Sequence, residues 1–188
     1  MKKVLLSILM VICIYPLQGK EKSYVANDNI DTEGWRFVSS IYENLYATFS
    51  TGAAASLKAT VSPANDTTFY LQICFNEGKL TMDEGSILLL KLGDGSNIEL
   101  HSNKVGLEDI ECQITKYGTH YYIYPMYEIT TEQIEKIINQ DVIKIRVQCT
   151  GGTFDREIKK QKLSKLYSKA YPAVIEVLSQ NKSVYDNF

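Results

Sequence analysis

The chain has 188 residues, of which 45% are hydrophobic and 22% are charged. This is the length of one globular domain with a sizeable core, and the composition excludes the disordered and fibrous classes of protein. The formal net charge of −2 excludes a general nucleic-acid-binding protein, because such proteins carry an excess of basic residues.

The N-terminus has the pattern of an export signal. A basic start is followed by an apolar run from Val4 to Leu17 and by the small residue Gly19. This predicts a signal peptide over residues 1–19, because the run is shorter than the roughly 20 residues that span a bilayer. No later run reaches that length, so we expect no transmembrane helix. We expect the protein in the periplasm, at the cell surface or outside the cell.

Residues 20–33 are polar and have no apolar period, which predicts a flexible leader. We expect a single β-rich domain over residues 34–181 and a tail over residues 182–188. No internal repeat and no low-complexity tract divides the domain.

Short apolar runs separated by turn residues predict strands along most of this domain. We expect strands near residues 35–38, 53–61, 67–75, 87–92, 97–100, 110–115, 120–127 and 143–149. Gly93-Asp94-Gly95 predicts a hairpin between the fourth and fifth of these strands. The run Ile87–Leu92 is almost entirely apolar, which predicts a central strand covered on both faces.

The clearest local pattern lies between Ile129 and Cys149. Thr130 and Gln133 have the spacing of a capping box, and isoleucines follow at helical spacing, which predicts a short helix near 131–139. The period then changes to two, as in a strand with one buried face. The side chains predicted to point inward are Ile143, Ile145, Val147 and Cys149, and those predicted to point outward are Lys144, Arg146 and Gln148.

Apolar residues recur at helical spacing near the C-terminus, which predicts a helix near 157–180. Pro172 lies inside it and predicts a kink or two helices. The stretch from Arg156 to Lys169 contains six basic residues and one acidic residue, Glu157. They make either a solvated helix face or a surface that docks on anionic lipid or polysaccharide.

These elements predict a mainly β (α+β) protein. Many short strands and few, late helices favour an antiparallel β-sandwich or open barrel, with a short helix near 131–139 and a C-terminal helix near 157–180. Strands and helices do not alternate, which argues against a doubly wound parallel sheet.

The familiar catalytic and metal-binding motifs are missing from the sequence. The two histidines, His101 and His120, stand outside any zinc-ligand spacing, and no Gly-x-Ser-x-Gly occurs. Gly93-Asp94-Gly95 lacks the lysine and the helix of a phosphate loop. We therefore predict no catalytic residue, no metal site and no cofactor.

Cleavage of the signal peptide would leave three cysteines, Cys74, Cys112 and Cys149. Export permits a disulfide, and strand parity favours Cys112 with Cys149, because both are predicted to point inward. The alternative is three free cysteines that act as small hydrophobic residues.

The chain holds 13 tyrosines, most densely between His120 and Tyr127. Strand parity points Tyr122 and Tyr124 outward, and a neighbouring strand that carried Lys144 and Arg146 would add cations to them. Exposed aromatic rings beside cations bind sugars or protein partners, so these four residues are a candidate surface for a glycan or an envelope protein. The alternative is that tyrosine is simply a favourable strand residue.

Three stretches carry a resemblance to a known group of proteins: Gly85–Leu100, Tyr127–Glu132 and Val142–Val147. With the signal sequence, they resemble the small secreted β-rich proteins of unknown function that are common in gut Bacteroidetes. The resemblance implies a β-rich secreted domain and supplies no catalytic residue. Asp66-Thr67-Thr68 is similar to the site that such bacteria O-glycosylate, with Thr67 as the acceptor.

The sequence therefore favours a non-enzymatic binding or accessory domain of the periplasm or cell surface. The alternative is a hydrolase that acts on cell-envelope or dietary polysaccharide. A deep pocket with two close carboxylates would favour the hydrolase, and a flat sheet that bears tyrosines would favour binding.

Overall fold

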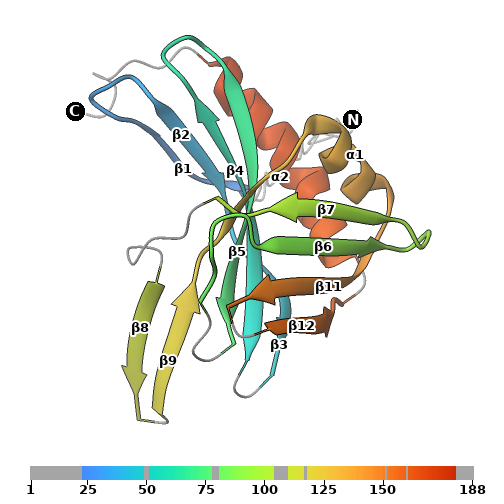
Figure 1. The fold of residues 1–188 in the computed structure, drawn as a ribbon. Coiled ribbons are helices and arrows are strands. Elements are labelled where there is room, and N and C mark those ends of the chain that lie inside the picture. The colour runs from blue at the N-terminus through green and yellow to red at the C-terminus, as the bar shows by residue number, and fades with distance from the viewer. Residues whose placement is uncertain are drawn as a thin grey trace, which may run out of the picture.

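A computed structural model describes residues 23–48, 51–77, 81–103, 110–116, 118–150, 152–159 and 161–180 (Figure 1). Over these residues the protein is mainly β, with two helices and two antiparallel sheets. The predicted fold class is therefore confirmed, including the short helix near 131–139 and the helix that ends the domain. The predicted signal peptide and the predicted tail lie outside the described residues.

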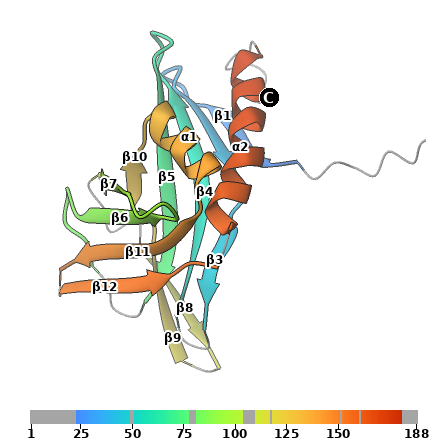
Figure 2. The ribbon, with the colours of Figure 1, turned by 90° about the vertical axis from the view of Figure 1, so that its right-hand side faces the viewer.

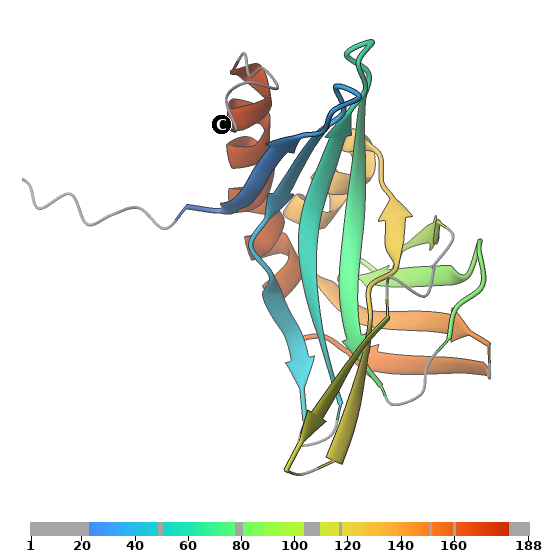
Figure 3. The same cartoon turned by 90° about the vertical axis from the view of Figure 1, so that its left-hand side faces the viewer.

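The larger sheet, sheet A, is curled into a half-barrel (Figures 1 and 3). Its strands follow the order β1 (Val25–Ile30), β2 (Arg36–Ser40), β4 (Gly52–Val61), β5 (Thr67–Asn76), β9 (Gly118–Ile123) and β8 (Ile110–Thr115). Two further strands pair outside this order: β3 (Glu43–Ala47) pairs with β4, and β10 (Met126–Glu128) pairs with β5. The ladder between β4 and β5 pairs every residue of both strands. These two strands are the axis of the sheet.

The smaller sheet, sheet B, has four strands, and they run across the direction of β4 and β5 (Figures 1 and 2). Their order is β12 (Gly152–Glu157), β11 (Val142–Cys149), β6 (Ile87–Leu92) and β7 (Asn97–His101). The predicted hairpin at Gly93–Gly95 joins β6 to β7.

Two helices, α1 (Thr131–Asn139) and α2 (Lys162–Ser179), close the core. The helix α2 packs against β1, β2, β3 and β4 and against α1 (Figure 2). The core draws on both sheets and both helices, and its fully buried members include Leu57, Ile73, Phe75, Leu88, Leu90, Ile134, Ile145 and Tyr167.

The opposite face of sheet A is open. Figure 3 shows β1, β2, β4, β5, β9 and β8 from this side, with both helices and sheet B behind them. We call it the outer face. The even-numbered residues of β4 and β5 point to it. The odd-numbered residues point to the core, where Ala53, Ala55, Leu57, Ala59, Leu71, Ile73 and Phe75 are buried.

The capping box of α1 is formed as predicted. The Gln133 N–H donates to Thr130 Oγ1 at 3.3 Å, and the Thr130 N–H donates to Gln133 Oε1 at 2.9 Å. Ile134 and Ile137 are buried against the rest of the core. Because a nine-residue helix has little stability alone, this burial holds α1 in place.

The inward assignment of Ile143 is wrong. Ile145 and Val147 are buried as predicted, but Ile143 is 37% exposed and Val142 is buried instead. The register of β11 against β6 shifts between Val142 and Lys144, so one extra residue interrupts the alternation. A β-bulge of this kind reverses the facing of the residues before it.

The burial predicted for β8 and β6 is also wrong. Cys112 pairs with Tyr121 and lies on the core side of sheet A, but the β8–β9 hairpin extends beyond sheet B, and nothing described covers it (Figures 1 and 2). Ile114, two residues on, is therefore 84% exposed. The central strand β6 is covered on one face only, because Lys91 is exposed and Leu89 is half-buried.

Both ends of the domain differ from the prediction. Val25–Ile30, expected in a flexible leader, forms β1 and pairs with β2. Residues 152–157, where the predicted helix was to begin, form β12, so the last helix begins only at Lys162, and it continues through Pro172. No helix among the described residues is long and apolar enough to cross a membrane.

The basic stretch near α2 is divided among different partners. Arg156 lies on β12 and pairs with Glu77, while Lys162 pairs with Glu43. These two cations are therefore not part of a free basic helix face. Docking of this stretch on an anionic surface stays a prediction.

Arg36 fastens the C-terminal end of α2 to sheet A. Its side chain forms two hydrogen bonds with the Asp28 carboxylate, at 2.9 and 3.1 Å. It also donates to the carbonyl oxygens of Val177 and Gln180, both at 2.8 Å. Because the last carbonyls of a helix have no partner within it, this buried cation completes the end of α2.

We expect Arg36→Met to lower the free energy of unfolding by about 3 kcal/mol, because it removes a buried cation from both Asp28 and the helix end. Urea unfolding measures this change. The matched control is Arg146→Met, which removes an ion pair between a largely exposed arginine and Asp155 and should lower the free energy of unfolding much less. Equal losses in the two variants would contradict the role given to Arg36.

Candidate functional site

A shallow hollow of about 220 Å³ lies on the outer face of sheet A, between the end of the β3–β4 hairpin and β9. We call it the Tyr122 hollow. It is lined by Asn44, Tyr46, Ala47, Thr48, Thr51, Gly52, Ala53, Ala54, Cys74, Asn76 and Tyr122.

Strand pairing explains how these residues meet. Ala54 lies opposite Asn44 on one side and opposite Cys74 on the other, so these three form a row across β3, β4 and β5. Two small side chains in this row leave room above the sheet. The strands β5 and β9 pair at Phe75 and Ile123, which brings Tyr122 to the same end of the face.

The lining of the Tyr122 hollow is neutral. Its described residues include the carboxamides of Asn44 and Asn76, the hydroxyls of Thr48 and Thr51, and the tyrosines Tyr46 and Tyr122, and none of them is charged. Amides and hydroxyls can both donate and accept hydrogen bonds, as the hydroxyl groups of a sugar do. An aromatic face beside them provides apolar contact for the C–H groups of a sugar ring.

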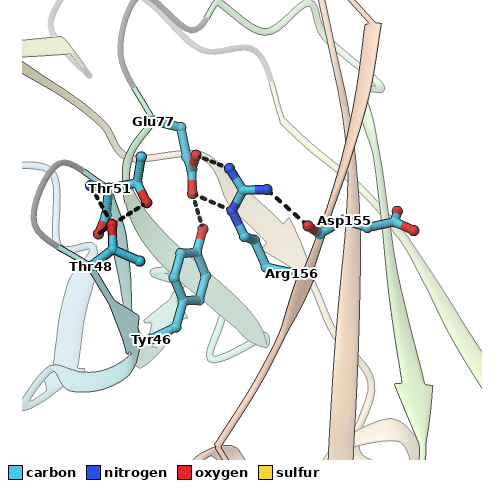
Figure 4. Close-up of polar contacts among 6 residues, drawn as sticks. All are labelled: Tyr46, Thr48, Thr51, Glu77, Asp155 and Arg156. Carbon is cyan, nitrogen blue, oxygen red and sulfur yellow. Dashed lines mark hydrogen bonds and ion pairs between the residues drawn. The ribbon is translucent and has the colours of Figure 1, made fainter.

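The hairpin at the rim of the hollow is held by its own threonines. Thr48 Oγ1 and Thr51 Oγ1 are 2.8 Å apart, and the Thr51 N–H donates to Thr48 Oγ1 at 3.0 Å. These contacts are drawn in Figure 4. They fix the two hydroxyls relative to each other before any ligand binds.

Cys74 lies in the floor of the hollow. Burial raises the pKa of its thiol. The thiol is therefore protonated at neutral pH, and a protonated thiol is a poor nucleophile. Cys74 thus contributes an uncharged surface to the hollow.

A chain of hydrogen bonds crosses the outer face beside the hollow. The Tyr42 hydroxyl donates to Gln72 Oε1, Gln72 Nε2 donates to the Tyr124 carbonyl at 3.4 Å, and the Tyr124 hydroxyl donates to Glu111 Oε2 at 2.8 Å. Burial, and then the bond to Glu111, raises the pKa of Tyr124. Tyr124 therefore stiffens the face that Tyr122 belongs to, and it does not line the hollow.

The hollow rests on a clamp between the two sheets, which Figure 4 shows. The Glu77 carboxylate, with 5% of its side chain exposed, accepts a hydrogen bond from the Tyr46 hydroxyl at 2.6 Å and another from Arg156 Nε at 3.0 Å. The Arg156 guanidinium also lies over the Phe154 ring, 5.2 Å from its centre. Tyr46 and Glu77 belong to the sheet A side, and Arg156 belongs to β12 of sheet B.

The predicted binding surface is divided between the two sheets. Lys144 and Arg146 are on the outward side of sheet B, where they line another hollow, of about 260 Å³. They do not join Tyr122 and Tyr124, because β11 pairs with β6 and β12 and not with β9. The prediction that the four residues form one surface is therefore wrong.

The remaining predicted site residues, Cys112, Cys149 and Thr67, line neither of these hollows. Cys74, Cys112 and Cys149 are free thiols, so the pairing of Cys112 with Cys149 is absent and the alternative of unpaired cysteines describes the structure. Thr67 is exposed at the start of β5, and its glycosylation stays a prediction. Among the described residues, no group of three His, Cys, Asp or Glu side chains is placed to hold a metal.

Comparison with known proteins found no matching family model, no matching curated protein and no matching solved structure. The function therefore has to be inferred from the residues of the site.

We expect Cys74 to react with iodoacetamide more slowly than Cys112 at pH 8. Cys74 is half-buried with a raised pKa, so little thiolate is present there, whereas Cys112 is exposed. Mass spectrometry of the peptides over time measures both rates. Equal rates would mean that the floor of the Tyr122 hollow is more open than the structure indicates.

Proposed function

We propose that the protein is an exported, non-catalytic binding domain that holds one neutral sugar ring of a glycan in the Tyr122 hollow. The observation that carries this proposal is the composition of the hollow: two tyrosines, two carboxamides and two threonine hydroxyls, with no charge among the described lining residues, on the face of sheet A away from the helices and sheet B.

The size of the hollow supports a ring within a longer chain. Its volume of about 220 Å³ is below the roughly 300–1,000 Å³ of pockets that enclose a whole small-molecule ligand. The open outer face leaves room for the neighbouring sugars of an oligosaccharide. Tyr42, which is exposed at 45%, lies on the same face and offers a second aromatic contact.

The affinity of a single ring should be modest. A net hydrogen bond between neutral groups contributes about 0.5–1.5 kcal/mol. A few such bonds and one aromatic contact correspond to a dissociation constant between about 1 mM and 1 μM. Accessory domains of this kind gain strength from repeated sugars or from a linked partner.

The alternative, a polysaccharide hydrolase, has less support from the carboxylates. The described hollow with several acids, about 440 Å³ beside α1, is lined by Asp94, Glu132 and Glu135. The Ser96 hydroxyl lowers the pKa of Asp94, and backbone and Thr130 hydrogen bonds lower the pKa of Glu132. A glycosidase needs one carboxyl group with a raised pKa to protonate the leaving oxygen.

The place of action is part of the same proposal. The basic and apolar N-terminus favours export, and the secreted Bacteroidetes proteins that this chain resembles would put it in the periplasm or at the cell surface. A cell-envelope or dietary glycan would be available in either place.

The test is binding to an array of neutral envelope and dietary oligosaccharides with wild type, Tyr122→Ala and Tyr70→Ala. We expect Tyr122→Ala to weaken binding at least about tenfold, which corresponds to ~1.4 kcal/mol. Tyr70 lies on the same outer face of β5 but outside the hollow, so Tyr70→Ala should bind like wild type.

Three results would overturn the proposal. They are the absence of any bound glycan, equal binding by all three proteins, and a weakening in Tyr70→Ala as large as that in Tyr122→Ala. Release of reducing ends from a bound glycan would favour the hydrolase instead.

A further inference from the structure

The second hollow lies on the outward side of sheet B and is lined by Leu89, Lys91, Gly95, Asn97, Lys144 and Arg146. It contains three cations, and none of its lining residues is acidic. We infer that this hollow binds an oxyanion, a sulfate, phosphate or carboxylate group, between Lys91, Lys144 and Arg146. This inference does not rest on the proposed sugar site, because the two hollows are on different sheets.

The arrangement of the lysines is unfavourable unless an anion lies near them. Lys91 on β6 and Lys144 on β11 are directly opposite each other in the ladder. Like charges in directly opposite positions destabilise a sheet. Residues that break a local rule of this kind are most often retained at functional sites.

A β-bulge directly precedes Lys144 in β11. The register moves from Val142 opposite Leu92 to Lys144 opposite Lys91, which leaves Ile143 as the extra residue and exposes it. Bulges occur preferentially next to functional sites, where they re-aim a side chain. Here the bulge changes the facing of the residues before Lys144, so that Val142 is buried and Ile143 is exposed beside the lysines.

One nearby carboxylate neutralises part of this charge. Asp155 contacts Lys144 Nζ at 2.6 Å and Arg146 Nε at 2.7 Å, so a single acid serves two cations. Within the described part of the chain, the ammonium group of Lys91 has no hydrogen-bond or ion-pair partner. The centre of the hollow therefore keeps an excess of positive charge.

Two more acids lie on the flanking strands and outside the hollow. Glu157 is opposite Lys144 on β12, and Glu99 is opposite Leu89 on β7. Glu99 is 3.1 Å from His101 Nε2 and is turned to that neighbour. The acids thus border the sheet, and the cations occupy its middle strands.

The remaining lining residues fit an oxyanion group. The half-buried Leu89 adds an apolar side chain to the lining, and a less polar surrounding strengthens the attraction between the cations and an anion. The Asn97 carboxamide, opposite Lys91 on β7, adds a neutral donor. A hollow of about 260 Å³ accommodates a small anion or the acidic group of a larger molecule.

The test is NMR titration of the full chain with inorganic sulfate, inorganic phosphate and glucuronate, each at constant ionic strength. We expect saturable shifts of the backbone amides of Lys91, Lys144 and Arg146 with at least one of the three. Tighter binding of glucuronate would indicate the carboxylate of an acidic sugar, and tighter binding of sulfate or phosphate would indicate a free ion or an ester.

Lys91→Gln should weaken the binding about tenfold, as expected for the loss of one charge-assisted hydrogen bond. It should not lower the melting temperature, because it removes the repulsion with Lys144, so the loss of binding could not come from unfolding. Lys165→Gln is the matched control, since Lys165 is an exposed cation on α2. Arg146→Gln is a second variant that should also weaken binding.

The inference is overturned if none of the three anions gives saturable shifts at these amides. It is also overturned if Lys91→Gln and Arg146→Gln both bind like wild type, or if Lys165→Gln loses as much affinity as they do.

Discussion

One nearly buried carboxylate, that of Glu77 directly after β5, joins sheet A to sheet B. Glu77 accepts hydrogen bonds from Tyr46 on β3 and from Arg156 on β12, and each of these residues comes from a different part of the chain. A buried carboxylate is costly unless it is paired and hydrogen-bonded, so the clamp specifies how these strands meet. Behind it, Phe75 and Phe154 pack edge to face across the same junction.

The position of the Tyr122 hollow depends on this clamp. Tyr46 belongs to both, and Asn76, which lines the hollow, directly precedes Glu77. With the rest of sheet A tied to α2 by Arg36, the outer face is supported from behind at both ends. A binding surface on a rigid sheet loses little conformational entropy when a ligand arrives, which matters most for weak neutral contacts.

Local sequence patterns were enough to predict the fold class, but they predicted only part of the candidate site. The capping box at Thr130 and the outward placement of Tyr122 could both be predicted, because each depends on near neighbours in the chain. The exposure of Ile143 could not, because a bulge is set by pairing with β6. Asn44 and Asn76 were missed for the same reason: only the ladders through β4 bring them together. The separation of Lys144 from Tyr122 depends on the order of strands in two sheets, which spacing along the chain does not encode.

The most direct test of the sugar site is an NMR titration of the full chain with a neutral oligosaccharide that the protein binds in the array experiment. The account predicts that shifts concentrate at the backbone amides of Asn44, Ala54, Cys74, Asn76 and Tyr122, and that the amides of Lys91 and Arg146 do not move. Shifts confined to sheet B, or spread evenly over both sheets, would contradict it.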